Sequence, residues 1–167
     1  MSRIGGFTLV ELMVVIVIFG FLMTMVTPAI STWQTKHRAE GEIERLHSEL
    51  QLARMKAYTE KVTWGVWWGS GNNPFNTYEL RRDNSTPPDG DINDAGDANA
   101  ASASNVKLPV KSSNSAIGSI TFDSRGFCNV LTTLYILDSG GASVDCLKTS
   151  SSRIKPGKWD GSNCNPK

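Results

Sequence analysis

The stretch of sequence that decides the fold lies at residues 6–30 and reads GFTLVELMVVIVIFGFLMTMVTPAI. The apolar run from Phe7 to Ile30 holds one ionisable side chain, Glu11. As a helix this run would be about 36 Å long, which is enough to cross a bilayer. A carboxylate inside such a span costs about 2.5–3.5 kcal/mol, so Glu11 needs a partner of opposite charge. The nearest candidate is the α-amino group that Phe7 would gain if the chain were cut after Gly6.

The segment from Gly6 to Glu11 resembles the cleavage site of type IV prepilins and type II secretion pseudopilins. The resemblance implies that a membrane prepilin peptidase cuts after Gly6 and that the new amino-terminal Phe7 is methylated. It also implies that Glu11 pairs with the Phe7 amine of a neighbouring subunit during filament assembly. Gly20 and Pro28 fall at positions where helices of this family loosen on assembly.

Two plainer interpretations of the same run compete with processing. A secretory signal peptide has a short apolar core followed by a small-residue cut site, but this run is too long and no Ala-x-Ala follows it. A single-pass anchor that holds an envelope domain and joins no filament stays open. Cleavage of the leader by the peptidase would distinguish a filament subunit from a plain anchor.

Length and charge bound the rest of the chain. Of 167 residues, those beyond the anchor suffice for one modest folded domain. The formal net charge is +1 and would fall to zero if Arg3 were removed with the leader, so no global field attracts nucleic acid or anionic lipid. The charge is uneven, with an acidic stretch over residues 83–97 and a basic tail over residues 148–167.

A helical pattern continues beyond the membrane-length run. Apolar side chains recur at steps of three and four and form one stripe, at Ala39, Ile43, Leu46, Leu50, Ala53 and Ala57. After a leader at residues 1–6 we therefore predict one helix, with a transmembrane or filament-core half over 7–30 and an amphipathic half over 31–60. Pro28 lacks an amide hydrogen and should bend or open this helix locally.

Short strand patterns follow the helix. They predict strands over residues 62–68, 75–81, 106–110, 119–122, 130–137, 144–147 and 152–155. Residues 83–105 are rich in Asp, Asn, Ser, Pro and Gly and are predicted to be an exposed loop. The sequence thus predicts an α+β fold, in which a small antiparallel β head over residues 61–167 packs on the second half of a long amino-terminal helix.

Parts of the head resemble the GspH/FimT (FimU-like) family of minor pilins. The similar segments are Ile120–Gly126 with the strand after it, Asp145-Cys146, and Ser152–Lys155. The resemblance implies a small β-sandwich-like head on the carboxyl half of the helix. It also implies a low-abundance subunit that primes or caps a filament, rather than the bulk subunit.

Three cysteines, Cys128, Cys146 and Cys164, suggest one disulfide and one free thiol in an exported domain. The sequence allows three pairings. We favour Cys146 with Cys164, because this bond would tie the carboxyl tail to the body of the head. A loop of that size contributes about 3 kcal/mol in the chain-entropy model.

The basic tail contains a candidate nucleic-acid site. Ser152–Lys155 resembles the Gly-Arg-x-Arg motif by which some FimT-like pilins bind DNA, with Ser in place of Gly and Lys in place of the second Arg. On a strand Arg153 and Lys155 would share one face, and Lys158 with Trp159 could add a phosphate contact and a stacking surface. The alternative is a solvated strand edge, where lysines discourage edge pairing.

The acidic stretch offers oxygen atoms that could bind calcium, at Asp89, Asp91, Asn93, Asp94 and Asp97. The EF-hand pattern fails, because counting from Asp89 an Asp stands where Gly is needed and Ala100 stands where Glu is needed. A solvated loop is therefore the favoured interpretation.

No nucleophile elbow, phosphate-binding loop or metal signature occurs in the sequence, so we expect no catalysis and no cofactor. We expect a minor type IV pilin that waits in the inner membrane with its head in the periplasm and then enters a filament. Its partners would be other pilins and the prepilin peptidase. The alternatives are a GspH-like minor pseudopilin of type II secretion and a FimT-like pilin that binds DNA during uptake.

Overall fold

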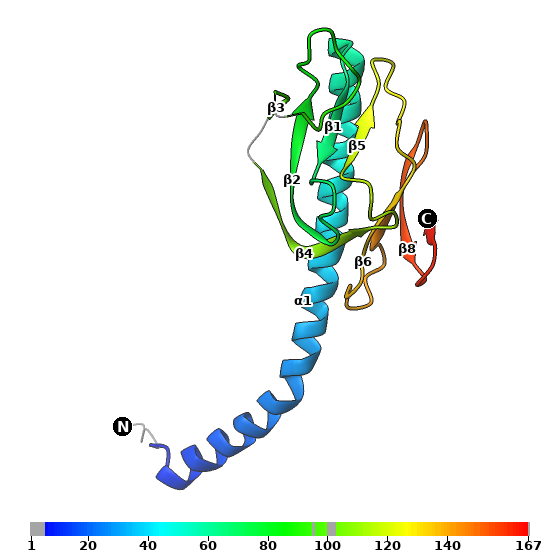
Figure 1. The fold of residues 1–167 in the computed structure, drawn as a ribbon. Helices are drawn as coiled ribbons and strands as arrows, with labels where there is room; N and C mark the ends of the chain where they lie inside the picture. The colour runs from blue at the N-terminus through cyan, green and yellow to red at the C-terminus, as the bar shows by residue number, and fades with distance from the viewer. Residues whose placement is uncertain (1–5, 95, 100–102, 167) are drawn as a thin grey trace. The chain divides into compact units, whose positions relative to one another are not determined.

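The computed structural model describes residues 6–94, 96–99 and 103–166, apart from the side chains of residues 25–29, 98 and 99. Helix α1 (Leu9–Glu60) is followed by short strands (Figure 1). The chain forms two compact units, Met1–Gln34 and Thr35–Lys167, and the boundary falls within α1.

Within the residues that the structure describes, we find no helix whose length and apolar character suffice to cross a membrane. Residues 25–29 of the predicted span lie outside the described side chains, and residues 1–5 of the predicted leader lie outside the described residues. The membrane anchor and the leader therefore stay predictions.

Helix α1 begins two residues later than predicted, at Leu9. The hydroxyl of Thr8 accepts a hydrogen bond from the Glu11 amide at 3.3 Å, and the Thr8 carbonyl accepts one from the Leu12 amide at 3.2 Å. Thr8 is therefore the N-cap residue. Its hydroxyl satisfies one of the amides that a helix start leaves without an intrahelical acceptor.

The second unit carries an antiparallel sheet on the second half of α1 (Figure 1). Its strands are β1 (Trp64–Trp67), β2 (Phe75–Arg82), β3 (Ala98–Asn99), β4 (Ser104–Ser112), β5 (Ser119–Phe122), β6 (Thr133–Ile136), β7 (Cys146–Thr149), β8 (Ile154–Trp159) and β9 (Cys164–Pro166). The strand order is β5-β1-β2-β4-β6-β7-β8-β9, and β3 pairs with β2. The predicted α+β pilin-like fold is confirmed.

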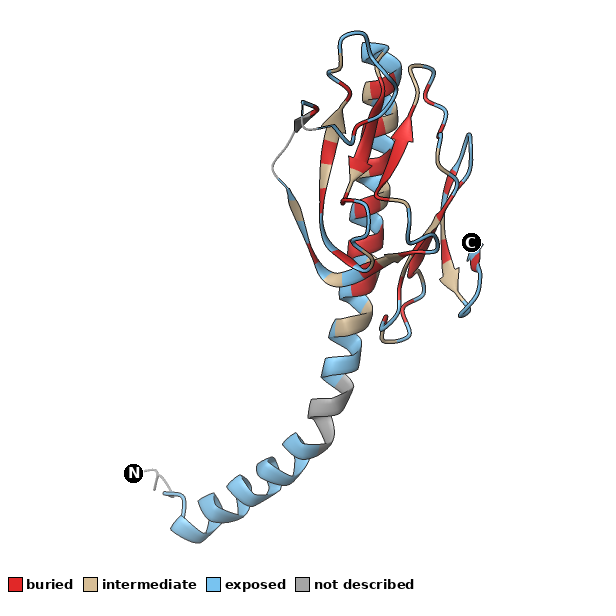
Figure 2. Cartoon of the chain, viewed as in Figure 1, coloured by how far each residue is buried: buried red, intermediate tan, exposed pale blue. Residues whose placement is uncertain are grey.

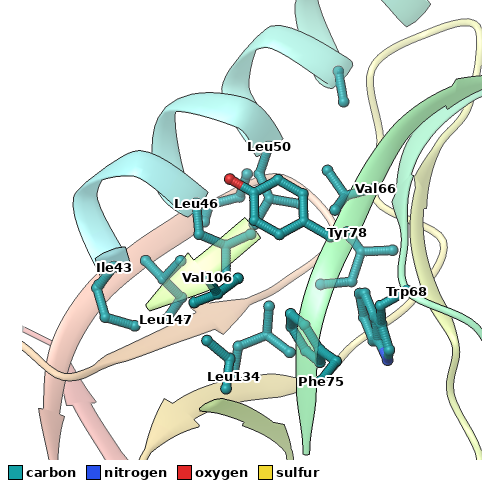
Figure 3. Packing of buried hydrophobic residues seen from close by; sticks show 14 of the residues in the cluster. Ile43, Leu46, Leu50, Val66, Trp68, Phe75, Tyr78, Val106, Leu134 and Leu147 are labelled. Atoms are coloured by element: carbon teal, nitrogen blue, oxygen red, sulfur yellow. The ribbon is translucent and has the colours of Figure 1, made fainter. Parts of the chain in front are cut away.

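The apolar stripe of α1 packs onto the inner face of the sheet, as the sequence predicts. All six stripe residues are at most 1% exposed, and the residues between them supply the exposed side of the helix (Figure 2). Leu46 and Leu50 lie beside Tyr78 of β2, and Ile43 lies near Leu147 of β7 (Figure 3). Each fully buried Leu or Ile contributes about 1.5–3 kcal/mol relative to exposure, so this stripe fixes the helix on the head.

Every predicted strand overlaps an observed one, and β5 agrees at both ends. The carboxyl-terminal strands differ most, because β8 extends to Trp159 and β9 was not predicted. Pro156 and Gly157 interrupt the alternating pattern in β8. The pairing of β8 with β9 nevertheless requires a glycine at position 157. A Cβ atom at Gly157 would lie 2.4 Å from the Asn165 carbonyl oxygen.

The segment 83–105, predicted to be an exposed loop, is only partly exposed. It contains β3 and the start of β4, and Asp83, Ile92 and Asp97 are buried. Ile92 packs over Gly65 of β1, where an added Cβ would lie 2.8 Å from Ile92 Cδ1. The carboxylates of Asp83 and Asp97 accept hydrogen bonds from four amides of the segment itself, which holds it against the head.

Candidate functional site

The first turns of α1 present an apolar surface. Every residue from Gly6 to Thr24 is exposed, and the large apolar side chains from Phe7 to Met23 are 44–81% exposed (Figure 2). A contiguous apolar surface of this kind marks contact with a membrane or with another protein. The structure thus places Phe7 and the residues after it where an external partner can reach them.

Glu11 lies in the first turn of this helix, three residues after the N-cap Thr8. The sequence Thr-x-x-Glu is that of a capping box, and a carboxylate at this position is stabilised by the positive end of the helix dipole. Among the described residues, no Lys, Arg or His side chain forms an ion pair with Glu11. The helix start therefore leaves the Glu11 carboxylate available to a cation from outside the described chain.

The two residues predicted to loosen the helix are not both described. Gly20 is exposed, and a Cβ atom added there would meet nothing within 4 Å. No packing within the described chain therefore requires a glycine at this position. The side chain of Pro28 lies outside the described ones. A role for Gly20 and Pro28 in assembly stays a prediction.

Two of the three predicted DNA-binding cations lie together in the head. Arg153 and Lys155 line a hollow of about 290 Å³ with Lys148, Ser150 and Pro166, and we call these five residues the basic hollow. Lys148 of β7 stands directly opposite Lys155 of β8. None of the described residues that line the basic hollow carries a carboxylate. Like charges that face each other across strands are destabilising, so an anion bound here would relieve the repulsion between Lys148 and Lys155.

Lys158, the third predicted cation, is engaged elsewhere. Its ammonium lies 2.5 Å from Asp145 Oδ2 and 2.7 Å from the Ala142 carbonyl oxygen. Asp145 is 2% exposed and also accepts hydrogen bonds from the Ser139 hydroxyl and the Trp159 amide. A buried carboxylate requires such a partner, so Lys158 neutralises Asp145, while its own side chain is 40% exposed.

Sequence reasoning missed Lys148 and Asp145 as members of these two clusters. Lys148 joins the basic hollow only through the register of β7 on β8, which the sequence does not reveal. Thr8 was also missed as the cap of α1, although the spacing Thr8 to Glu11 is a recognisable sequence signal.

The calcium candidates lie in the segment between β2 and β3. Asp89, Asp91 and Asp94 are exposed, and the Asp89 carboxylate accepts a hydrogen bond from the Asp91 amide at 2.9 Å. The negative charge of Asp89 is the main cause that raises the pKa of Asp94. No group of three or more His, Cys, Asp or Glu residues suited to a metal ion occurs in the described part of the chain. These observations favour the solvated-loop interpretation.

The disulfide joins Cys146 of β7 to Cys164 of β9, which is the pairing favoured from the sequence. It ties the last strand to the body of the sheet. Cys128 is the free cysteine, and its buried thiol donates a hydrogen bond to the Val130 carbonyl at 3.0 Å. Burial raises the pKa of this thiol and keeps it protonated.

Known proteins resemble this chain both in its amino-terminal sequence and in its fold. Residues 1–27 match the family model described as the prokaryotic N-terminal methylation motif. No curated protein matches the chain. The fold is similar to two crystal forms of the type IV minor pilin FimU of Pseudomonas aeruginosa. The P21 form has a TM-score of 0.56 and 16% identity, and the match covers 75% of this chain and 92% of that one.

The P65 form has a TM-score of 0.53 and 19% identity, and the match covers 71% of this chain and 92% of that one. Identities this low establish the fold alone. The chain thus combines a pilin-like fold with an N-terminal methylation motif. Membership of the GspH/FimT family stays a prediction.

Proposed function

We propose that this chain is a minor type IV pilin that primes or caps pilus assembly after cleavage between Gly6 and Phe7. The observation that carries the proposal is the exposed apolar helix start, in which Glu11 is the lone charged side chain and would be the fifth residue after the expected cut site. The methylation motif over residues 1–27 and the FimU-like fold support it. The head would stay periplasmic while the helix waits in the inner membrane.

The proposed assembly step is a charge pairing between subunits. Removal of the leader creates an amine at Phe7, and Glu11 forms no ion pair with a Lys, Arg or His side chain of the described chain. In a low-dielectric helix bundle, the Glu11 carboxylate of one subunit then meets the Phe7 amine of the next. Removing one partner of such a buried pair costs about 3–5 kcal/mol, because the other charge is left unpaired.

Replacement of Glu11 tests this step. We expect Glu11→Ala to be cleaved and methylated normally but to fall at least about tenfold in sheared filaments, because each 1.4 kcal/mol is a factor of ten. The measurements are mass spectrometry of the amino terminus and immunoblotting of filaments. Glu44→Ala is the matched control, since Glu44 is an exposed acid on the second half of α1. Normal incorporation of Glu11→Ala would contradict the proposal.

The same helix would serve a GspH-like minor pseudopilin of type II secretion. Deletion of the gene distinguishes the two systems. Loss of surface pili with normal protein secretion supports the pilus role, whereas loss of secretion with normal pili supports the pseudopilus. An uncleaved amino terminus in cells that contain the peptidase would instead indicate a plain anchored envelope domain.

A DNA-binding pilin is the second candidate function, and the basic hollow is the observation that favours it. Lys148, Arg153 and Lys155 present three cations without a carboxylate among them. Lys148 replaces Lys158 in the set first predicted, because Lys158 pairs with Asp145. Three phosphate contacts would give a slope of about −2.7 in a plot of log affinity against log salt concentration for B-DNA.

A mobility-shift assay at two salt concentrations tests DNA binding. We expect joint replacement of the three cations of the basic hollow by Ala to remove binding and its salt dependence. Lys107→Ala is the control, because Lys107 is an exposed cation on β4, away from the basic hollow. Equal binding by the triple variant and the native chain would exclude the basic hollow as the DNA site.

A further inference from the structure

A second cluster of cations lies in the head, where α1 meets β4. It surrounds a hollow of about 400 Å³, which we call the α1–β4 hollow. The hollow is lined by His37, Arg38, Gly41, Glu42, Arg45 and Lys107. Arg38 and Arg45 come from α1 and Lys107 from β4, and all three side chains are exposed. The fold thus brings together cations that lie up to 69 residues apart in the chain.

Two hydrogen bonds join the walls of the α1–β4 hollow. Arg45 Nη1 donates to the Asn105 carbonyl of β4 at 3.3 Å, and the Lys107 amide donates to Glu42 Oε1 at 3.2 Å. Glu42 is the one carboxylate among the described lining residues, and it is 8% exposed. Because Glu42 accepts a backbone amide and is buried, three cations face solvent in the hollow against one engaged acid.

Gly41 gives the α1–β4 hollow its room. It lies three residues after Arg38 and four before Arg45, so these three positions share one face of α1. A Cβ atom added at Gly41 would meet nothing within 4 Å. Glycine weakens a helix relative to alanine, and no packing within the described chain requires it here. The missing side chain leaves space between the two arginines that a ligand can fill.

The lining of the hollow fits a phosphate group. A guanidinium presents paired N–H donors that match phosphate oxygens, and a lysine ammonium adds a point charge. No large apolar side chain is found among the described lining residues, so a ligand would be held by charge and hydrogen bonds.

The sequence places this hollow within reach of a membrane surface. Arg38 follows Ile30, the end of the predicted span, by eight residues of α1, or about 12 Å of helix. The headgroup layer extends about 5–7 Å beyond the hydrocarbon core. Helix side chains lean toward the amino end, and a long arginine side chain can reach back to the lipid phosphates.

We propose that the α1–β4 hollow binds the phosphate of an anionic lipid headgroup while the chain waits in the membrane. This inference rests on the anchored state of the proposed function and goes beyond it, because it gives the head a membrane contact before assembly. The contact orients the head at the membrane surface. It is released when the helix leaves the bilayer for the filament.

Photo-crosslinking of the full chain in nanodiscs tests the ligand. The nanodiscs contain phosphatidylcholine and a small fraction of phosphatidylglycerol with a photoreactive headgroup, and products on residues 35–48 are measured by mass spectrometry. We expect joint Arg38→Gln and Arg45→Gln to lower the yield about tenfold, because each cation near an anionic surface adds affinity. Joint Lys148→Gln and Lys155→Gln removes the same charge outside the hollow and should change the yield less than about twofold. Equal yields from the two double variants would overturn the inference.

Filling the space at Gly41 gives a second readout at unchanged charge. We expect Gly41→Leu to lower the crosslinking yield about fivefold, because the leucine side chain occupies the room between the two arginines. Ser48→Leu is the control, since it adds the same side chain at an exposed position of α1 outside the hollow. Leucine favours the helix at both positions, so folding is retained. A native yield from Gly41→Leu would also overturn the inference.

Free phosphate distinguishes a lipid from a soluble ligand. We expect phosphatidylglycerol to raise the melting temperature of the head in nanodiscs, and inorganic phosphate added to phosphatidylcholine nanodiscs not to do so. An equal rise with inorganic phosphate would overturn the lipid assignment.

The outcomes also separate this inference from the proposed function. If Gly41→Leu crosslinks normally while Glu11→Ala stays out of filaments, the inference fails and the proposed function stands. If the native chain crosslinks at the hollow but never enters filaments, the proposed function fails and the inference stands. If the native chain is not retained in membranes, both fail.

Discussion

The two halves of α1 use apolar side chains in opposite ways. From Phe7 to Met23 the large apolar side chains are all exposed, around the whole helix. From Ala39 to Ala57 the buried apolar side chains form one stripe, and the charged side chains between them reach solvent or the strands. The first pattern stays exposed, whereas the second is buried against the sheet. One helix thus exposes its apolar side chains in its first half and buries them against the sheet in its second.

Leucine-to-alanine substitutions in the two halves should separate these roles most strongly. Leu46 is 1% exposed beneath the sheet, and Leu12 is 57% exposed. We expect Leu46→Ala to lower the free energy of unfolding of the head by about 2–5 kcal/mol, because it leaves a cavity in the core. Leu12→Ala should leave that free energy unchanged. Urea unfolding of the full chain in detergent, followed by tryptophan fluorescence, measures both.

Equal stability losses for Leu46→Ala and Leu12→Ala would contradict the division of α1 into two roles. The buried tryptophans Trp64 and Trp68 report on the head in this measurement, because both lie in its core. If Leu12→Ala leaves the stability of the head unchanged but lowers the amount of the chain in filaments, the first half of α1 contributes to assembly and not to folding of the head.

The division of α1 could be predicted from the sequence because both halves follow simple rules. The spacing of Ile43, Leu46 and Leu50 defines a helical stripe, and the strands from 62 to 137 alternate regularly. The ends of β8 and the existence of β9 could not be predicted in this way. β9 contains three residues, and it exists through pairing with β8 and the disulfide to Cys146. A local sequence pattern does not reveal strand pairing or a disulfide between residues far apart in the chain.

The candidate sites were predictable to different degrees for the same reason. Phe7 and Glu11 belong to one contiguous motif, so sequence alone singles them out. The basic hollow depends on the register that brings Lys148 opposite Lys155. The pairing of Lys158 with Asp145, which lies just before β7, is likewise a long-range contact. Charge alone could not tell a cation offered to solvent from one that neutralises a buried acid.

Acidic residues offer the second comparison between the halves. Glu42 is 8% exposed and accepts a hydrogen bond from the Lys107 amide of β4 at 3.2 Å, whereas Glu11 is exposed at the helix start. We expect Glu42→Ala to lower the free energy of unfolding of the head by about 1–2 kcal/mol, since an acceptor is lost. Glu11→Ala should change it by less than about 0.5 kcal/mol. The same urea experiment applies, and a destabilised head in Glu11→Ala would contradict an intermolecular role.

Each half of α1 also contains one exposed glycine, Gly20 and Gly41, and a Cβ atom at either would meet nothing within 4 Å. We expect Gly41→Ala to raise the free energy of unfolding of the head by about 0.5–1 kcal/mol, because alanine favours the helix. Gly20→Ala should leave the head unchanged and reduce filament incorporation, because it stiffens a helix that is proposed to loosen on assembly. Normal incorporation of Gly20→Ala would remove Gly20 from the assembly residues.

The smallest expected effect concerns Glu40, which fixes the second half of α1 to the loop before β7. Its carboxylate accepts a hydrogen bond from the Ser143 amide at 2.8 Å, and this bond is the main cause that lowers the pKa of Glu40 below its ordinary value of 4.5. A lowered pKa in the folded state stabilises the head above that ordinary value, and the stabilisation is lost as the pH falls through the lowered pKa.

Glu40→Gln should therefore lower the melting temperature by about 1–2 °C at pH 7, and the difference should shrink toward zero as the pH falls to about 3. Thermal unfolding of both proteins across this pH range measures the effect. Gln51→Glu is the control, because it adds an exposed acid to the same helix. It tests whether any change of charge on α1 alters the melting temperature. A difference that stays constant down to low pH would show that the ionisation of Glu40 is not its source and would contradict the prediction.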